Sequence, residues 1–267
     1  MSETEDGFLT EPLDALREEI RQKYSDWRVL LVQSNRIAVA NQHSIEIHRD
    51  NNVELFAAAL YARTLSTVQA SILLLEVGLV PQSRTLLRAA METLFKLAAI
   101  AKDSTVVVNL LKGHDKEKDR VVKNVKRLQH PELKKLVGEE ISSGKLNLLF
   151  SSSAGAMSAF DFAKIAELED WYFMVYMVFS WSTHGAASDL DRHVLKNQDG
   201  YITGLCNEPE IEDQESTWSC AIDILLKSTS ALAAVFPNVD KTPLEHLYAD
   251  FSEMVTKFQC AQETSTS

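Results

Sequence analysis

The sequence is poor in the residues that interrupt regular secondary structure. Its 267 residues include only 9 Gly and 6 Pro, which are too few for an all-β fold with many tight turns. The three cysteines, Cys206, Cys220 and Cys260, stand far apart without a C-x-x-C pair. This usage argues against a disulfide framework and a cysteine zinc site, and it is typical of a reducing compartment.

Signals for targeting and for membrane insertion are also missing. The first residues are acidic and lack the positive start and apolar stretch of a signal peptide. The uninterrupted apolar run 171–179 is far shorter than the roughly 20 residues that span a membrane. The longer stretch 55–79 is interrupted by Arg63, Gln69 and Glu76. We therefore predict a cytoplasmic protein that has no membrane partner.

The charge balance limits contact with nucleic acids. A formal net charge of −11 disfavours sequence-independent binding by the whole surface, because such binding requires neutralisation of phosphates. The segment 112–135 is the exception, with nine Lys or Arg against four Asp or Glu. Its residues Lys123, Lys126 and Arg127 are candidates for phosphate contacts. The alternative is that these interspersed charged residues only form the solvent-exposed face of a helix.

Apolar residues recur at helical spacing along most of the chain. The predicted helices cover 12–34, 52–77, 81–101, 104–129, a short stretch from 131, 161–168, 170–190, 215–236 and 243–260. A joint of only four residues, from Gly78 to Pro81, makes two of these helices an antiparallel pair. The fold class is therefore all-α, a multi-helix bundle built on long antiparallel helix hairpins. At most one small β-hairpin is expected, near 194–205, where Asp199-Gly200 predicts a turn.

Neither a repeat nor a linker divides the sequence into separate folding units. We predict an N-terminal helical arm over 1–50, a bundle domain over 51–260 and a disordered tail over 261–267. Within the bundle, the run 171–179 has no polar face and is expected to be buried on all sides. The apolar side chains of Tyr24, Trp27 and Leu31 have no assigned partner in the chain, so we also expect a homo-oligomer.

One predicted helix carries an ionic stripe. Arg84, Arg88 and Glu92 recur at intervals of four residues and therefore share one helix face. Most of their neighbours are Leu and Ala, which leaves little polar surface around the stripe. A buried ion pair of this kind often marks a functional site. The alternative is a structural salt bridge on a solvated face.

A second polar group follows the apolar run 171–179. Ser180 and His184 stand one helical turn apart, with Gly185 next in the chain. A histidine titrates near neutrality and serves as a general acid or base, and the alternative is a core histidine that joins two helices. The Glu-x-x-His pattern of di-iron bundles and Gly-rich phosphate loops are both missing from the sequence. We therefore predict neither a metal site nor a cofactor.

These polar positions form a pattern along the chain. The pattern consists of Arg63-x-x-Ser66, Leu75-Glu76-x-Gly78-Leu79, Arg84-x-x-x-Arg88-x-x-x-Glu92 and Tyr176-x-x-x-Ser180-x-x-x-His184-Gly185. Its order and spacing over about 51–190 resemble the bacterial helical family catalogued as domain of unknown function 5677. The resemblance implies an all-α bundle in which the arginine–glutamate helix faces the histidine helix. It implies no assigned activity.

The arrangement is more distantly similar to HEPN-type helical domains. Many of those domains are metal-independent RNases of toxin and phage-defence systems, with an Arg-x4–6-His motif late in the bundle that is usually paired across a dimer. This chain departs from the motif, since its nearest match, Arg36 and His43, lies near the N-terminus.

Two functional hypotheses follow from these observations. The first is a defence- or toxin-type protein that acts on or senses RNA or another nucleic acid. Its candidate catalytic residues are His184 as acid or base, Arg88 as the cation that stabilises a phosphorane, and Glu92 as the group that orients an arginine. Its candidate substrate-binding residues are Arg84, Ser180, Tyr176, Lys123, Lys126 and Arg127. The second hypothesis is a non-catalytic module that binds a protein partner and uses a buried Arg/Glu/His network to fix helix register.

The surroundings of Arg88, Glu92 and His184 separate the two hypotheses. Convergence of the three on an open cleft beside the basic segment 112–135 would favour action on a nucleic acid. A closed network with every hydrogen bond satisfied would favour the interaction module.

Overall fold

A computed structural model describes residues 13–111, 132, 135, 157–184 and 190–265. Its helices are α1 (Asp14–Lys23), α2 (Ser25–Ser44), α3 (Asn52–Leu75), α4 (Val80–Lys102), α7 (Ala159–Ile165), α8 (Glu169–Trp171), the π-helix η2 (Tyr172–Tyr176), α9 (Met177–His184), the 3-10 helix η3 (Asp191–His193), α11 (Glu215–Val235) and α12 (Thr242–Ser265). Its strands are β1 (Val194–Lys196) and β2 (Ile202–Leu205).

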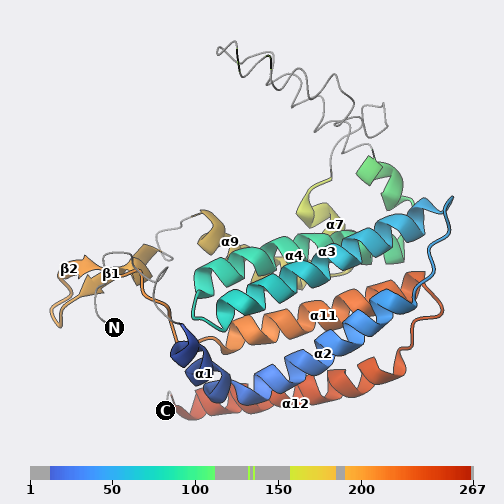
Figure 1. Cartoon of the computed structure of the whole chain (residues 1–267). Helices are drawn as coiled ribbons and strands as arrows, with labels where there is room; N and C mark the ends of the chain where they lie inside the picture. The colour runs from blue at the N-terminus through green and yellow to red at the C-terminus, as the bar shows by residue number, and fades with distance from the viewer. Residues whose placement is uncertain (1–12, 112–131, 133–134, 136–156, 185–189, 266–267) are drawn as a thin grey trace.

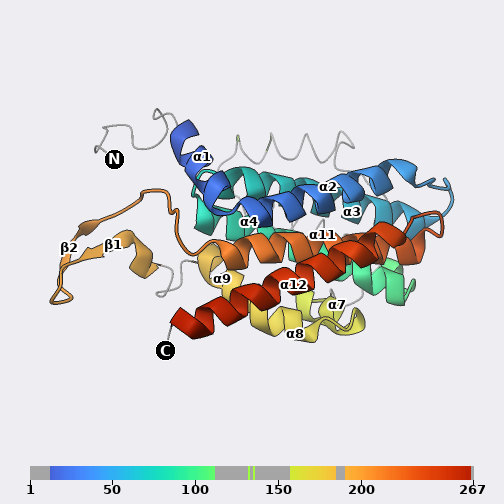
Figure 2. The same cartoon turned by 90° about the horizontal axis from the view of Figure 1, so that it is seen from below.

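The predicted all-α bundle is confirmed, as is the single small hairpin near 194–205. Helices α3 and α4 form the antiparallel pair expected from the short joint, and α11 packs against α2, α3 and α4 (Figure 1). Helix α12 packs against α2 and α11 and covers the side of the bundle that lies opposite α3 and α4 (Figure 2). Strands β1 and β2 pair antiparallel, with Val194 opposite Leu205.

Local residue choices explain the bounds of α3. The Asn51 side chain accepts hydrogen bonds from the N–H groups of Val53 and Glu54 and so caps the start of the helix. At the other end Gly78 adopts φ +78°, a left-handed conformation that glycine takes without steric cost. The carbonyl of Gly78 accepts a hydrogen bond of 2.8 Å from the N–H of Glu210, which ties the joint to the chain before α11.

Helix α11 is the centre of the core, since 14 of its 21 residues are buried. Trp218 of this helix stacks on Tyr24 at 6.2 Å between ring centroids, and Trp27 meets Phe258 of α12 edge-on at 6.1 Å. Tyr24, Trp27 and Leu31 are all buried within the chain. The expectation that these three side chains are free for a partner copy is therefore wrong, while the homo-oligomer itself stays a prediction.

Tertiary contacts also move helix boundaries in the N-terminal region. The expected single helix over 12–34 is two helices that meet at Tyr24, and the second continues to Ser44. The Tyr24 hydroxyl donates to the carbonyl of Ile211 and accepts from the N–H of Gln214, which holds the break in place. Helix α2 packs against α11, so the segment predicted as an arm contributes to the bundle. At the other end α12 continues to Ser265, so the tail predicted from residue 261 is helical up to that point.

The prediction that the run 171–179 is buried on all sides is wrong. Tyr176 and Phe179 are buried, whereas other apolar residues of the same run face solvent. We call η2 and α9 together the aromatic helix, and we call its exposed apolar residues the aromatic ridge: Phe173, Met174, Met177, Val178 and Trp181, which are 40–74% exposed. The reason is position, because the aromatic helix packs on α4 along one side at the outside of the bundle.

Among the residues that the structure describes, two helices are long and apolar enough to cross a membrane. They are α3 and α11, which both pack against other helices of the bundle; 39% of the apolar stretch of α3 and 67% of that of α11 are buried. The core helices of soluble proteins pass the same test, so this is weak evidence for a membrane. The predicted cytoplasmic localisation is not tested by it.

Candidate functional site

Helix α4 turns its ionic stripe towards the aromatic helix and its apolar face towards the core. Leu87, Met91 and Leu94 are fully buried and fix the rotation of the helix about its axis. Pro81, which has no N–H to donate, stands in the first turn, where that donor is not needed. Arg88 and Glu92 therefore project from successive turns of α4 at the same side. They face Tyr176 and Ser180 of the aromatic helix.

Arg88 is the hub of a polar network that joins α4 to the aromatic helix. Its Nε donates to Ser180 Oγ at 2.9 Å, its Nη2 donates to the Tyr176 hydroxyl at 2.8 Å, and its Nη1 lies 3.2 Å from Glu92 Oε1. The Tyr176 hydroxyl in turn donates to Glu92 Oε1 at 2.8 Å. We call these four residues the Arg88 network. All three guanidinium nitrogens have partners within the chain.

The surroundings of the network favour a fixed geometry. Tyr176 packs edge-on against Phe95 at 5.9 Å and stacks on Tyr172 at 4.9 Å between ring centroids. The Arg88 guanidinium carbon lies 4.7 Å from the centroid of the Tyr176 ring, a cation–π contact. Burial raises the pKa of Tyr176 far above its usual value, and the Glu92 carboxylate beside it raises the pKa further. The hydroxyl thus stays protonated and keeps donating to Glu92.

The network is partly open to solvent at one side. The Arg88 side chain is 19% exposed and the Glu92 side chain 34% exposed. A partly exposed ion pair supported by neutral hydrogen-bond partners is less costly to bury than an isolated one. The arrangement can therefore hold two helices together without the desolvation penalty of a fully buried pair.

Arg84 lies beside the network and has different partners. Its Nε donates to Thr217 Oγ1 at 3.0 Å, and its guanidinium carbon lies 5.7 Å from the ring centroid of Phe179. Thr217 stands in the first turn of α11. Arg84 therefore connects α4 with the start of α11 and with the aromatic helix.

The side chains of the remaining predicted site residues lie outside what the structure describes. His184 is the last residue of α9, one turn after Ser180, but its side chain is not among the described ones. Lys123, Lys126 and Arg127 also lie outside the described residues. The structure therefore brings Arg88, Glu92, Tyr176 and Ser180 together and places Arg84 next to them.

The π-helix η2 was not expected from the sequence. It covers Tyr172–Tyr176 and so ends on the tyrosine of the network. Single π-helical turns are rare and occur often at functional sites. All nine residues of the run 171–179 are apolar, so the sequence shows no regular α-helical spacing of polar and apolar positions there. This missing spacing is the feature of the sequence that coincides with the π-helical turn.

A groove lies between the aromatic helix, α11 and α12, with a cavity volume of about 600 Å³. We call it the α11 groove; its lining consists of Arg84, Trp171, Met174, Val175, Val178, Phe179, Ser216, Ser219, Cys220, Asp223, Phe251, Val255, Phe258 and Gln259. This volume is within the range of ligand pockets, about 300–1,000 Å³. Two residues of the aromatic ridge, Met174 and Val178, form part of its wall.

An acidic residue in the groove was not singled out from the sequence. Asp223 is buried in α11 and pairs with Lys227 one turn later. Burial raises the pKa of Asp223, and the nearby Lys227 reduces this rise without cancelling it. The Lys227 Nζ also lies 4.6 Å from the centroid of the Trp171 ring. This pair therefore joins α11 to α8, which directly precedes the aromatic helix.

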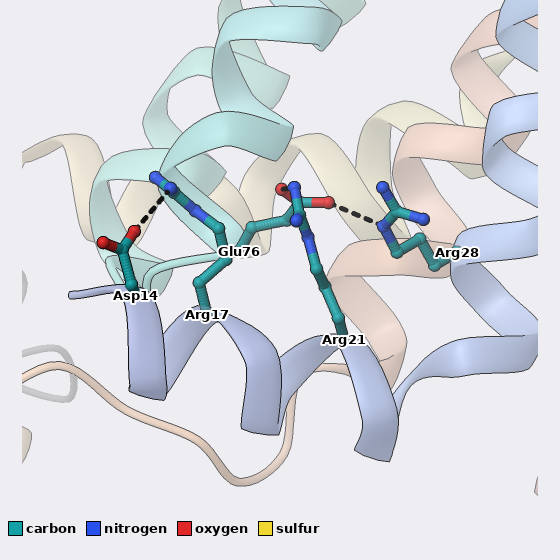
Figure 3. A network of polar contacts seen from close by, with 5 residues as sticks. All are labelled: Asp14, Arg17, Arg21, Arg28 and Glu76. Carbon is teal, nitrogen blue, oxygen red and sulfur yellow. Dashed lines mark hydrogen bonds and ion pairs between the residues drawn. The ribbon is translucent and has the colours of Figure 1, made fainter.

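A second buried polar cluster centres on Glu76, at the end of α3 (Figure 3). Glu76 is 4% exposed. Its Oε2 accepts from Arg21 Nη2 at 2.6 Å, and its Oε1 accepts from Arg28 Nε at 2.9 Å. Because Arg21 belongs to α1 and Arg28 to α2, one carboxylate ties both N-terminal helices to α3. The sequence pattern contained Glu76 but did not indicate these partners.

The Glu76 cluster predicts an acid-sensitive contribution to stability. Burial by itself raises the pKa of Glu76, but the hydrogen bonds and charges of Arg21 and Arg28 outweigh burial and lower the pKa. A carboxyl group with a lowered folded-state pKa stabilises the fold above its unfolded pKa of about 4.3, and this stabilisation disappears as the pH falls through the folded-state value. Glu76→Gln should therefore cost about 2 kcal/mol at pH 7.

Urea unfolding of wild type and Glu76→Gln at pH 7, 5, 4 and 3 would check this prediction. The difference in unfolding free energy should shrink as the pH falls below the unfolded pKa of Glu76. A difference that stays constant down to pH 3 would show that the ion pairs contribute nothing specific.

Among the described residues, no group of three or more His, Cys, Asp or Glu side chains is placed to hold a metal ion.

The fold and the site define a class of protein: an all-α bundle in which one core helix holds an aromatic helix through an arginine–tyrosine–glutamate network. A family model described as a family of unknown function (DUF5677) matches residues 54–202, more than half of the chain, and the chain belongs to this family. The matched range includes the four residues of the Arg88 network. No curated protein and no solved structure matches the chain. The likeness to HEPN-type domains receives no support from these comparisons and stays a prediction.

Proposed function

We propose that the protein is a non-catalytic interaction module whose aromatic ridge binds a protein partner. The observation that carries this proposal is the exposure of five large apolar side chains on one short helix. Monomeric soluble proteins rarely expose extended apolar patches, and larger ones mark interaction sites. Aromatic residues and methionine, which make up most of the ridge, are enriched in protein interfaces.

The Arg88 network has a defined task under this proposal. Its hydrogen bonds to Tyr176 and Ser180 fix the rotation of the aromatic helix on α4. With Tyr176 and Phe179 buried, the opposite face of the same helix faces outward. A rigid ridge loses little conformational entropy on binding, which favours affinity.

The nucleic-acid hypothesis has less support from the geometry. The Arg88 guanidinium is already paired with Ser180, Tyr176 and the Glu92 carboxylate, so a phosphate would compete with these groups for its charge and its N–H donors. Within the described residues Arg84 is likewise engaged with Thr217. RNA cleavage with His184 as acid or base stays a prediction with its own test. Cleavage by wild type that is lost in a folded His184→Ala variant would replace the interaction module with a nuclease.

Site-specific photo-crosslinking in cells tests the interaction proposal. A photoreactive phenylalanine analogue at Phe173 or Trp181 should form adducts of defined mass with a protein. The control position is Leu73 of α3, which is 63% exposed but lies outside the ridge. Adducts at the ridge and none at Leu73 are expected. Equal labelling at all three positions, or none at the ridge, would overturn the proposal.

A further inference from the structure

Exposed apolar side chains are concentrated in one segment of the described chain. Among the side chains that the structure describes, fifteen large apolar ones are exposed. Ten of them lie within 173–205: Phe173, Met174, Met177, Val178, Trp181, Leu190, Leu195, Tyr201, Ile202 and Leu205. The segment thus contains two uncovered structures, the aromatic ridge and the β1–β2 hairpin.

The hairpin has little of its own to stabilise it. The two strands pair only with each other in the sheet that the structure describes. Leu195, Tyr201, Ile202 and Leu205 are 49–82% exposed. A two-stranded hairpin is at best marginally stable in water, and uncovered apolar strands invite contact with another chain. The hairpin therefore needs a surface that covers it.

We propose that a second copy of this chain supplies that surface, and that each hairpin lies against the aromatic ridge of the other copy with apolar side chains in its α11 groove. The inference rests on the proposed function and names the partner. A two-fold interface uses the same surface on both copies. Every copy carries both the uncovered hairpin and an uncovered groove, so a symmetric pair covers all four surfaces at once.

The placement of the two surfaces fits this exchange. The hairpin projects at the same end of the bundle as α9 and the C-terminal end of α12, as both views show (Figures 1 and 2). The C-terminal part of α12 contributes Val255, Phe258 and Gln259 to the groove. Two copies that meet at this end can therefore each extend a hairpin towards the groove of the other. The cavity of about 600 Å³ has room for several side chains of the size of Tyr201 and Leu205.

Charge indicates the same surfaces. Two chains with a net charge of −11 each repel one another. The stretch 171–181 has no charged residue, and 194–205 has one Lys and one Asp. Contact between these stretches brings the copies together where repulsion is weakest. Since salt screens the remaining repulsion, self-association should become tighter as ionic strength rises.

The available area is sufficient for a stable pair. Ten side chains with four-tenths to four-fifths of their surface exposed provide on the order of 1,000 Å² of apolar area per chain. A standard protein interface buries about 800 Å² per partner. These ten side chains can therefore account for an interface without help from other surfaces.

Sedimentation of the 267-residue chain is the first test. The 29.9 kDa chain should sediment with the mass of two copies, and more completely at high salt. The double substitution Ile202→Glu and Leu205→Glu should shift it to one copy. Leu73→Glu, a matched charge on an exposed leucine of α3, should leave the pair intact. A wild-type monomer at every concentration and salt level would overturn the inference.

A crosslink between two different variants tests the hairpin-to-groove arrangement itself. Both variants carry Cys206→Ser, Cys220→Ala and Cys260→Ser, so that no native thiol is left, including the one that lines the groove. One then receives Tyr201→Cys and the other Met174→Cys, and the two are mixed with a short bismaleimide. Covalent pairs should form with Met174→Cys and not with Leu73→Cys. Linkage of Met174→Cys only to itself would show ridge-to-ridge contact and overturn the exchange of hairpins.

These outcomes separate the inference from the proposed function. A chain that is monomeric, but whose ridge forms photo-adducts with a different protein, would keep the interaction module and reject the second copy. A chain whose ridge forms no adduct of any kind would reject both.

Discussion

Gly78→Ala should destabilise the protein by about 3–4 kcal/mol, because the substitution adds backbone strain and a steric clash together. Gly78 has φ +78°, which costs a residue with a side chain about 1–3 kcal/mol. An added Cβ would also lie 2.8 Å from Pro209 Cβ and 2.9 Å from the backbone nitrogen and oxygen of Glu210. Relief of this contact would separate the α3–α4 joint from the chain before α11 and strain the 2.8 Å hydrogen bond between them.

Gly200→Ala provides the matched control for this substitution. Gly200 has φ +83°, nearly the same conformation, but no atom lies within 4 Å of an added Cβ. The control should therefore lose only the strain energy, about 1 kcal/mol at an exposed turn. Urea unfolding of wild type and both variants measures the two costs. Equal losses in the two variants would show that the close approach to Pro209 and Glu210 costs nothing.

The positions of the central helices could be predicted because their boundary signals are local. The predicted helices at 52–77 and 81–101 agree with α3 and α4 within two residues at each end. The glycine that follows α3 and the proline in the first turn of α4 act through the few residues around them. Such signals depend little on contacts with distant parts of the chain.

The break at Tyr24 and the exposure of the aromatic ridge could not be predicted in this way. Tyr24 ends α1 because its hydroxyl and ring contact residues nearly 200 positions later in the chain. The run 171–179 is apolar at every position, so its sequence does not distinguish the buried face from the exposed one. Contacts with α4 decide that Tyr176 is buried and that Met177 faces outward.

The site shows the same division between local and distant effects. The spacing of Arg88 and Glu92 predicts a shared helix face, since both residues belong to one helix. The distant partners Tyr176 and Ser180 were expected only from the resemblance to a family. The pairing of Glu76 with Arg21 and Arg28 crosses three helices, and a single sequence gives no sign of it.

Arg88→Ala should destabilise the protein by about 3 kcal/mol and loosen the aromatic helix from α4. The substitution removes two hydrogen bonds, to Ser180 and Tyr176, and an ion pair with Glu92, whose carboxylate is left without its cation. Hydrogen bonds to charged groups contribute about 1.5–3 kcal/mol each, and those of a shared network do not add. Arg88→Lys should recover only part of the loss, because an ammonium group cannot match the three directions of the guanidinium.

Arg63 of α3, an exposed arginine in the same family pattern, gives the control. Arg63→Ala should change the free energy of unfolding by less than about 0.5 kcal/mol.

A double-mutant cycle with Tyr176→Phe then separates the positioning of the aromatic helix from general stability, with an expected coupling of about 1–3 kcal/mol between Arg88 and Tyr176. Near-UV circular dichroism should show the aromatic signals weakening in Arg88→Ala at temperatures where the helical signal is intact. If the coupling is near zero and the aromatic signals persist, Arg88 does not position the aromatic helix, and the ridge owes its orientation to the packing of Tyr172 and Tyr176 against Phe95 of α4.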